Sequence, residues 1–513
     1  MKITLLSRTA PTGILLALLA TAQTQGATAI IDVGTKYQTI RGFGASTAWG
    51  SSFSSAQDPD LLWSKYSGAG LSLHRIRIDP SSGNTSELAI AQKAVTYGVS
   101  VWATPWTPPA ADKSNNNTVM GTLTNPSAYA TYLVNFAKTM KSKGVPLYAV
   151  SAQNEPDANV DYESCVYTGA TMATWVGKSM GPAFAGTGVK VMAPETQNWY
   201  GFATFWPVLK ADTSFMKYAD IVATHEYGGS PKAYPEIQAA GKDFWETEIY
   251  DMDGKDADTG ITSGLRVAKL IHEALTIANV NAWHYWWVYS TGSGGLFTNG
   301  KATKRLWVEG NYARFVRPDH VRVSATAAPT SGVTVSAFYG PNLNYGMLSE
   351  GNSSMMCVVI VAINTNSTAT SQSFSISGFP GTKATPYVTD TTRALAAQTA
   401  VTVSGNSFSY SLPSKSVTSF VIDPASTGIN AQASAQHLLQ VVRRADGFWA
   451  KLPSQEPGHV ELLTISGRLL ESRNLPAGAS EAFLGNPAGD GLYLARLIQG
   501  GSVFTARLFQ PSR

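Results

Sequence analysis

The sequence predicts an α/β protein built on a (β/α)8 barrel, with a β-sandwich beside it and a small all-β module at the C-terminal end. Three observations predict this. Strand-like and helix-like segments alternate over residues 41–317, period-two patterning follows over residues 318–423, and a second β-rich region fills residues 438–513. Such alternation is typical of parallel α/β folds, and 513 residues are too many for one ordinary domain.

The first 26 residues have the pattern of an export signal. Lys2 and Arg8 supply positive charge around a short apolar run at 13–20, and cleavage sites of small residues lie at 20–22 and at 27–29. The apolar run is too short to cross a bilayer comfortably. We therefore expect a secreted or cell-surface protein without a membrane span.

Eight strands and their intervening helices are expected in the barrel. Segment 126–143 illustrates the helical pattern, because it begins at a proline directly after Asn125 and ends at Lys143 before Gly144. The alternative, an open doubly wound sheet, is disfavoured because the glycine fingerprint of dinucleotide-binding folds is missing. The expected strands are 40–45, 71–79, 99–104, 147–153, 190–193, 221–225, 244–248 and 282–288, and the helices include 87–97, 126–143, 172–185 and 261–278.

The other segments are all-β or linker. Residues 318–423 are rich in Val, Ser, Thr and Ala in period-two alternation, which predicts a sandwich. Strands at 27–40 have no helix partner, so we expect them to join this sandwich. Residues 424–437 are small and polar, as in a linker. Residues 438–513 are then a separate β module.

Composition narrows the function classes. The net charge is only +4, and no basic run with interleaved aromatics is present, which argues against nucleic acid as a partner. The seven histidines are scattered and the two cysteines do not frame them, so we expect no metal and no cofactor. The abundant Trp and Tyr residues suit both core packing and stacking on sugar rings.

Two glutamates stand where barrel strands end. The apolar run from Leu147 stops at Pro156, because proline cannot continue a central strand, and this puts Glu155 at the C-terminal end. The aromatic-rich segment 243–249 places Glu248 similarly. In a barrel these ends carry the chemistry. Cleavage of a glycosidic bond needs two carboxyl groups, one protonated and one ionised. Glu246, on the same strand face as Glu248, competes with it.

The order and spacing of several motifs resemble family 30 glycoside hydrolases, most closely their bacterial xylanase branch. The resemblance covers residues 40–318 and implies a TIM barrel whose side β-sandwich is built from both chain ends. It also implies a retaining mechanism. The motifs are Gly42-Phe43-Gly44, Thr104-Pro105-Trp106-Thr107-Pro108-Pro109, Gln153-Asn154-Glu155-Pro156-Asp157, Thr247-Glu248, Trp283-His284-Tyr285-Trp286-Trp287 and Phe315-Val316-Arg317-Pro318.

By this resemblance, Glu155 is the general acid/base and Glu248 the nucleophile. Glu248 is preferred to Glu246 because the family more often has an apolar residue at the position of Glu246. Retention requires the two carboxyl groups about 5–5.5 Å apart. We expect the ionised Glu248 to raise the pKa of Glu155.

The resemblance also implies substrate-binding residues. Arg75 would orient the nucleophile, and Asn154 would hydrogen-bond the 2-hydroxyl of the reacting sugar. His225 and Tyr227 match a His-x-Tyr motif on the sixth strand, from which Tyr227 could donate to the nucleophile. The candidates for stacking on sugar faces, with core packing as the alternative, are Trp49, Trp106 and Trp286.

The loop after the last barrel strand departs from the branch that acts on glucuronic-acid-decorated xylan. In that branch an arginine pair clamps the acidic group, whereas this chain has Ser290 and Thr291. We therefore expect an exported, monomeric, retaining endo-β-1,4-xylanase that acts on plant xylan and does not depend on glucuronic acid. The alternatives are a β-glucanase or β-glucosidase of the same family and a non-catalytic polysaccharide-binding protein.

The C-terminal module resembles the sorting domains of bacterial secreted proteins. The resemblance rests on a Ser-Gly-Arg turn at 466–468 and on the Gly-Leu-Tyr-Leu-Ala-Arg segment at 491–496. A carbohydrate-binding or stalk module is the alternative. Since no row of aromatic residues is apparent in this part of the sequence, sorting is favoured.

Overall fold

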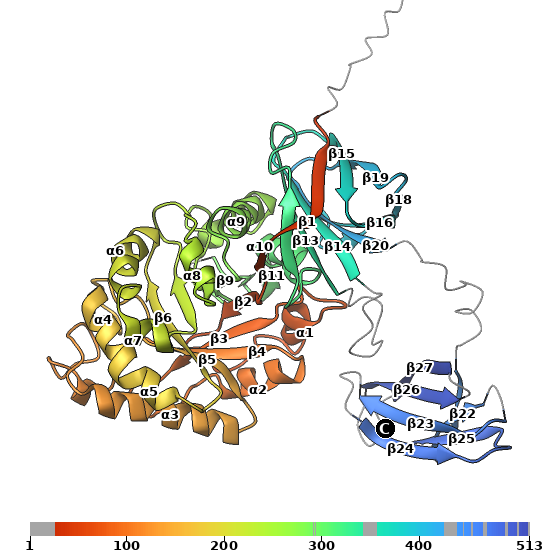
Figure 1. Ribbon diagram of the computed structural model, residues 1–513, viewed down its shortest axis with the longest axis horizontal. Helices are drawn as coiled ribbons and strands as arrows, with labels where there is room; N and C mark the ends of the chain where they lie inside the picture. Colours follow the sequence, from red (N-terminus) through yellow and green to blue (C-terminus); the bar gives the residue numbers. More distant parts are fainter. Residues whose placement is uncertain are drawn as a thin grey trace, which may run out of the picture.

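Eight parallel strands close into a barrel in which each strand pairs with the next and the last pairs with the first (Figure 1). The predicted fold class is confirmed, and each strand boundary lies within three residues of its expected position. The strands are β2 (Gly42–Ser46), β3 (Leu73–Ile78), β4 (Ser100–Pro105), β5 (Leu147–Ser151), β6 (Lys190–Thr196), β7 (Ile221–Thr224), β8 (Asp243–Glu246) and β9 (Ala282–Trp287).

The structure is a computed structural model. Its described residues are 26–290, 292, 294–341, 356–424, 439–444, 446–452, 455–464, 469–487, 491–499 and 502–510. The expected export signal lies outside the described residues, except for Gly26, as do nearly all of the expected linker and the turn at 466–468. Within the described part of the chain, no helix is both long enough and apolar enough to cross a membrane.

Helices cover the barrel, and several were not expected. The predicted helix at 172–185 is α4 (Gly169–Trp175), a π-helical turn and α5 (Gly181–Phe184). Helix α6 was missed because five aromatic residues and Pro207 mask its periodicity. The other helices are α1 (Asp58–Trp63), α2 (Leu88–Thr96), α3 (Pro126–Ser142), α6 (Trp199–Leu209), α7 (Thr213–Tyr218), α8 (Pro235–Ala239), α9 (Ile261–Glu273) and α10 (Lys304–Ala313).

Aromatic side chains fill the interior of the barrel. Trp245 stacks on Tyr148 with ring centroids 5.7 Å apart and meets Trp102 edge-on at 6.1 Å. The indole of Trp102 donates to Nε2 of His284 at 3.0 Å. Gly44 is required here, since an added Cβ would lie 2.6 Å from a strand carbonyl oxygen and 2.7 Å from the His284 ring. The barrel interior is thus closed by packed rings.

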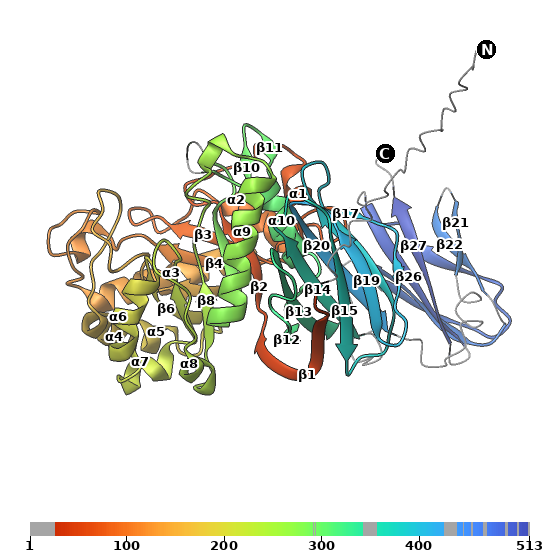
Figure 2. The same ribbon diagram turned by 90° about the horizontal axis from the view of Figure 1, so that it is seen from above.

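A second, ten-stranded sheet lies beside the barrel (Figure 2). Strand β1, from the N-terminal end of the described chain, runs antiparallel to β12 and parallel to β15. The strands are β1 (Ala29–Thr39), β12 (Val321–Ala325), β13 (Val333–Pro341), β14 (Met356–Asn364), β15 (Thr370–Ser377), β16 (Gly381–Thr389), β17 (Ala396–Ala397), β18 (Val401–Thr402), β19 (Ser407–Leu412) and β20 (Ser416–Pro424).

This sheet is continuous and folds over on itself. Strands β15 and β19 stand at one end of the strand order and β20 near the other. Nevertheless Phe374 and Phe408 both pack on Phe420, with ring centroids 5.2 Å away. Two layers therefore face one apolar core, although they belong to one sheet. Helix α10 joins the barrel to this sheet, because Asn311 donates to the Tyr387 carbonyl and accepts from the Ser419 hydroxyl.

The last described residues form a separate β module with its own core. Buried side chains such as Phe448, Leu462 and Leu497 form that core. One sheet has the order β21-β22-β25 and the other β24-β23-β26-β27. The strands are β21 (Gln440–Arg444), β22 (Gly447–Lys451), β23 (Gly458–Thr464), β24 (Leu469–Leu475), β25 (Glu481–Gly485), β26 (Gly491–Gln499) and β27 (Ser502–Gln510).

Candidate active site

The two predicted catalytic glutamates lie just beyond the C-terminal ends of β5 and β8. Glu155 adopts a left-handed backbone with φ 46°, and its amide donates to the carbonyl of Glu195 at 3.0 Å. The amide of Glu248 donates to Oε1 of Glu246 at 2.8 Å. Glu155 is 4% exposed and Glu248 is 5% exposed. Both carboxyl groups are therefore held in a largely dry site at the end of the barrel that carries chemistry.

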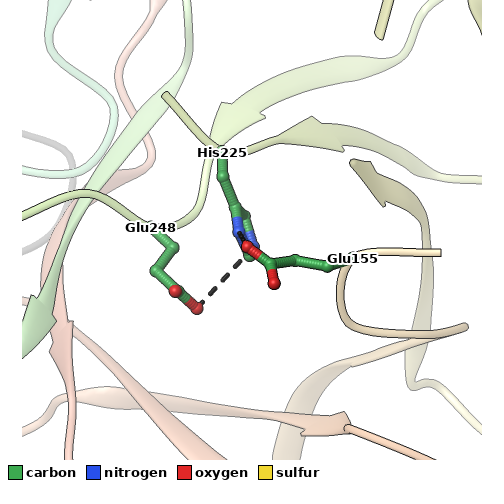
Figure 3. A group of neighbouring side chains, drawn as sticks. All are labelled: Glu155, His225 and Glu248. Atoms are coloured by element: carbon green, nitrogen blue, oxygen red, sulfur yellow. Dashed lines mark hydrogen bonds and ion pairs between the residues drawn. The ribbon is translucent and has the colours of Figure 1, made fainter. Parts of the chain in front are cut away.

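His225, directly after β7, lies between the two glutamates (Figure 3). Its Nδ1 lies 3.1 Å from Oε1 of Glu155, and its Nε2 lies 3.8 Å from Oε2 of Glu248. One ligand atom from each of the three side chains falls within 4.8 Å of the others. A carboxylate oxygen of Glu155 and one of Glu248 are thus no more than 4.8 Å apart.

Arg75, on β3, connects the two sides of the site. Its guanidinium is fully buried and donates through Nη1 to Oε2 of Glu248. Through Nη2 it donates to Oδ1 of Asn154 at 2.6 Å and to Oε1 of Glu195 at 2.6 Å. Two predicted site residues, Glu248 and Asn154, are therefore joined with Glu195 by one planar cation, which is suited to paired carboxylates.

Two tyrosines complete the contacts of the glutamates. Tyr227 donates from its hydroxyl to Oε1 of Glu248 at 2.9 Å. Tyr162 donates to Oε2 of Glu155 at 2.6 Å. The sequence analysis named Tyr227 but missed Tyr162 and Glu195. Glu195 did carry a signal, since it comes shortly after the predicted strand 190–193 and adjoins a proline, although Pro194 precedes it whereas Pro156 follows Glu155. Tyr162 lies in a loop and carried none.

Glu246 has a different environment from Glu248. It is fully buried and accepts the backbone amides of Glu248 at 2.8 Å and of His284 at 2.9 Å. Burial and the neighbouring Glu226 raise the pKa of Glu246 well above its usual value. Glu246 therefore holds backbone in place through both of its carboxyl oxygens, and this favours Glu248 as the reacting group.

The electrostatics of the glutamate pair differ from expectation. Burial acts to raise the pKa of Glu155, but the hydrogen bond and charge of His225, with the hydrogen bond from Tyr162, outweigh burial and lower it. Burial raises the pKa of Glu248, although His225 and Arg75 oppose the rise. The expectation that Glu248 raises the pKa of Glu155 is wrong for the free protein, because an imidazole lies nearer to Glu155 than Glu248 does.

His225 itself is strongly affected. Burial acts to lower its pKa, yet the carboxylates of Glu248, Glu155 and Glu195 raise it to about 10. His225 is therefore a cation at neutral pH. Within the described residues, one group of side chains is close enough to ligate a metal ion, and it consists of Glu155, His225 and Glu248. The positive charges of Arg75 and His225 already balance the negative charges of the Glu155 and Glu248 carboxylates.

Three tryptophans gather beside Arg75. Ring centroids of Trp49 and Trp106 lie 4.8 Å apart, and Trp286 lies 6.3 Å from Trp49 and 5.8 Å from Trp106. The Arg75 guanidinium lies 4.6 Å from the Trp106 ring. Trp49 is 42% exposed, Trp286 is partly exposed and Trp106 is 2% exposed. The structure thus brings the three predicted platforms together, with Trp106 as the buried support.

The loop after β9 is fastened by an acidic residue. Asp256 accepts the amides of Gly292 and Gly294 through its two carboxylate oxygens. Ser290 belongs to the described part of this loop, whereas Thr291 lies outside the described residues. A carboxylate therefore lies beside the part of this loop that follows Ser290.

Comparison with known proteins gives the family. The model of the glycosyl hydrolase family 30 TIM-barrel domain matches residues 33–270. The glucuronoxylanase XynC of Bacillus subtilis strain 168 is 32% identical over 408 residues, which cover 77% of this chain and 91% of the relative. The chain belongs to glycoside hydrolase family 30. The resemblance inferred from the sequence motifs is thereby confirmed, and this family 30 protein is a glycoside hydrolase.

Solved structures agree with this family. The family 30 subfamily 8 xylanase Xyn30A from Clostridium acetobutylicum has a TM-score of 0.69 at 35% identity, covering 77% of this chain and 99% of that one. The family 30 endoxylanase from Clostridium papyrosolvens C71 has a TM-score of 0.66 at 34% identity, covering 77% and 100%. The family 30 enzyme thus shares its barrel and adjoining sheet with proteins described as xylanases.

Proposed function

We propose that this family 30 enzyme is a retaining endo-β-1,4-xylanase that hydrolyses plant xylan by double displacement. The observation that carries the mechanism is the approach of the Glu155 and Glu248 carboxylate oxygens to within 4.8 Å. Inverting enzymes separate their carboxyl groups by about 6.5–9.5 Å to admit a water molecule. The xylanases and glucuronoxylanase among the relatives support xylan as the substrate.

Glu248 acts as the nucleophile. Arg75 and Tyr227 each donate to one of its oxygens, which aims the carboxylate and favours its ionised form. Attack on the anomeric carbon forms a covalent glycosyl-enzyme and expels the leaving oxygen. Asn154 is fixed by the bond from Arg75 to its Oδ1, and its Nδ2 serves the 2-hydroxyl of the reacting sugar.

Glu155 acts as the acid and then as the base. For the first step the proton on His225 Nδ1 transfers to Oε1 of Glu155, which leaves His225 neutral, and Glu155 delivers a proton to the leaving oxygen. Once Glu248 is esterified, its negative charge is lost, which favours the ionised form of Glu155 and suits it to deprotonate the incoming water. The exposed faces of Trp49 and Trp286 bind neighbouring sugar rings.

Activity is proposed to be independent of glucuronic acid. Ser290 brings no cation to the loop after β9, and the carboxylate of Asp256 fastens that loop through two glycine amides. An acidic substituent would be repelled by a nearby carboxylate rather than clamped. A neutral, undecorated xylan backbone carries no charge that this carboxylate could repel.

A product profile tests the substrate. We expect linear xylooligosaccharides and glucuronoxylan to be cut at rates within about threefold of each other, since a rim charge contributes little. The purified enzyme would be incubated separately with glucuronoxylan, arabinoxylan, linear xylooligosaccharides and β-glucans, and the products separated by chromatography. Cleavage of glucuronoxylan alone, with products spaced by the uronate, would contradict independence from glucuronic acid.

The second candidate is a β-glucanase or β-glucosidase. A putative glucosylceramidase of Caenorhabditis elegans matches 248 residues at 25% identity, covering 38% of this chain and 48% of that protein. Activity confined to β-glucans in the same experiment would select this candidate. The non-catalytic alternative is set aside, because the chain is a glycoside hydrolase.

Tyr162 is expected to set the alkaline limit of activity. Its hydroxyl stabilises the ionised form of Glu155, so Tyr162→Phe raises the pKa of Glu155 and keeps the acid protonated to higher pH. The alkaline limb of the kcat/KM profile should move up by about 0.5–1 pH unit, because Tyr162 is 42% exposed and water can partly replace its hydroxyl. Tyr200→Phe, at an exposed tyrosine of α6, is the matched control. A downward movement would contradict this role.

Export and sorting belong to the same proposal. The N-terminal signal pattern fits secretion of an enzyme whose polymeric substrate lies outside the cell. The separate core of the C-terminal module fits an appended sorting unit. We propose a secreted or cell-surface monomer.

A further inference from the structure

Glu195 is a third buried carboxylate in the active site, and neither catalytic role uses it. It lies near the C-terminal end of β6 and is fully buried. Its backbone is left-handed, with φ 61°, a conformation that a non-glycine residue seldom adopts. Such a conformation persists only where surrounding contacts hold it, and it is common at functional sites.

The contacts of Glu195 reach both catalytic glutamates. Its Oε1 accepts from Arg75 Nη2 at 2.6 Å and lies 3.4 Å from His225 Nε2. Its backbone carbonyl accepts the amide of Glu155 at 3.0 Å. Arg75 in turn donates to Glu248, and His225 contacts Glu155 through its other nitrogen. One carboxylate oxygen is thus shared by the two cations that serve the catalytic pair.

We propose that Glu195 is a positioning residue that acts as the common counter-ion of Arg75 and His225, holding Arg75 against Glu248 and His225 against Glu155. The inference rests on the proposed function, because it assigns Glu195 to the same double displacement. Glu195 touches neither the sugar nor the reacting atoms.

Charge balance explains why a third carboxylate is needed. Arg75 and His225 are both fully buried, and a buried cation without a partner is costly. Glu248 loses its negative charge when the glycosyl-enzyme forms, so Arg75 then loses one of its two carboxylate partners. Glu195 keeps its charge throughout the cycle. The titratable groups that face His225 are Glu155, Asp157, Glu195, Glu246, Glu248 and Tyr227, and Arg75 shares Glu195 and Glu248 with it.

The test is Glu195→Gln, which keeps the shape of the side chain and removes its charge. The His225 imidazole would be titrated by NMR in protein labelled at histidine, its signal being assigned by its loss in His225→Asn. We expect His225 to titrate about one pH unit lower or more, since one of its three carboxylate partners becomes neutral. We expect turnover of xylooligosaccharides to fall on the order of 100-fold.

Substrates with different leaving groups show whether Glu195 serves both glutamates. Dinitrophenolate leaves without being protonated, so hydrolysis of a dinitrophenyl xylobioside needs no general acid. A variant in which only the acid function of Glu155 is impaired would therefore cleave this substrate at the wild-type rate. We expect Glu195→Gln to slow this substrate as well as xylooligosaccharides, because Arg75 also loses its counter-ion. Glu309→Gln, at a fully buried glutamate of α10, controls for removal of a buried carboxyl group and should keep its activity.

Three results would overturn the inference: an unchanged His225 titration, turnover within twofold of wild type, or full retention of activity on the dinitrophenyl substrate. The titration needs no substrate, so it can be measured even if the wild type cleaves no xylan. Failure of the wild type on xylan would count against the proposed function, whereas an unmoved His225 titration counts against the role of Glu195.

Discussion

Glu248→Gln is expected to lower kcat on xylooligosaccharides on the order of 10⁴- to 10⁶-fold, the range found when a catalytic nucleophile is removed. An amide cannot form the glycosyl ester that double displacement requires. It also removes the charge that pairs with Arg75. Binding should survive, because the tryptophan platforms and Asn154 are unchanged. Calorimetry with xylohexaose would measure binding, and reducing-sugar release would measure turnover.

Glu246→Gln is the matched comparison. The carboxyl group of Glu246 accepts two backbone amides, and an amide of the same shape keeps one oxygen that can still accept one of them. We expect turnover within about tenfold of wild type, the cost of altering one buried hydrogen bond. A 2-fluoro xylobioside with an activated leaving group should trap a peptide that contains both glutamates, and tandem mass spectrometry would locate the label. A label on Glu246 would reverse the assignment.

Glu155→Ala is expected to produce a loss that depends on the leaving group. Turnover of xylooligosaccharides should fall about 10³- to 10⁴-fold, near the upper range for general acid–base catalysis. A dinitrophenyl xylobioside leaves without a proton, so its first step should remain fast, and the glycosyl-enzyme should accumulate because no base activates water. A burst of dinitrophenolate followed by slow turnover, recorded by stopped flow, would show this.

Azide provides the control for Glu155. In Glu155→Ala, azide attacks the glycosyl-enzyme without needing a base, so it should restore turnover and yield the β-xylosyl azide. In Glu248→Ala, azide replaces the nucleophile on the opposite face and should yield the α-azide. NMR of the products distinguishes these outcomes. If Glu155→Ala lowers turnover equally on xylooligosaccharides and on the dinitrophenyl xylobioside, and azide does not restore turnover, Glu155 is not the acid/base.

Local pattern was sufficient for the barrel and for the position of Glu155 and Glu248 near its strand ends. Residues such as Leu147–Ser151 are apolar because a parallel strand in a barrel is covered on both faces. A proline then marks where the strand ends, and in a parallel barrel all such ends lie on one face. The position of Glu155 therefore followed from its neighbours in the chain. Glu195 also adjoins a proline, but Pro194 precedes it and β6 continues to Thr196, so local pattern indicates its place at the strand end less directly.

Other features depend on residues far apart in the chain. Short or aromatic helices such as α6 were missed because their helicity depends on packing against the barrel. The sandwich expected from strand patterning is one continuous sheet whose folding over depends on contacts such as Phe374 with Phe420. Period-two alternation marks a buried face, but it does not specify which strands share a sheet.

The sequence by itself determined the fold class, the family and the positions of Glu155 and Glu248, because strand ends and catalytic motifs are local properties of the chain. Only the tertiary structure decided the charges at the site. The pKa of Glu155 is lowered by His225, which lies 70 residues away in the chain but 3.1 Å away in space. Electrostatic energies depend on distance and burial, and neither can be obtained from spacing along the sequence.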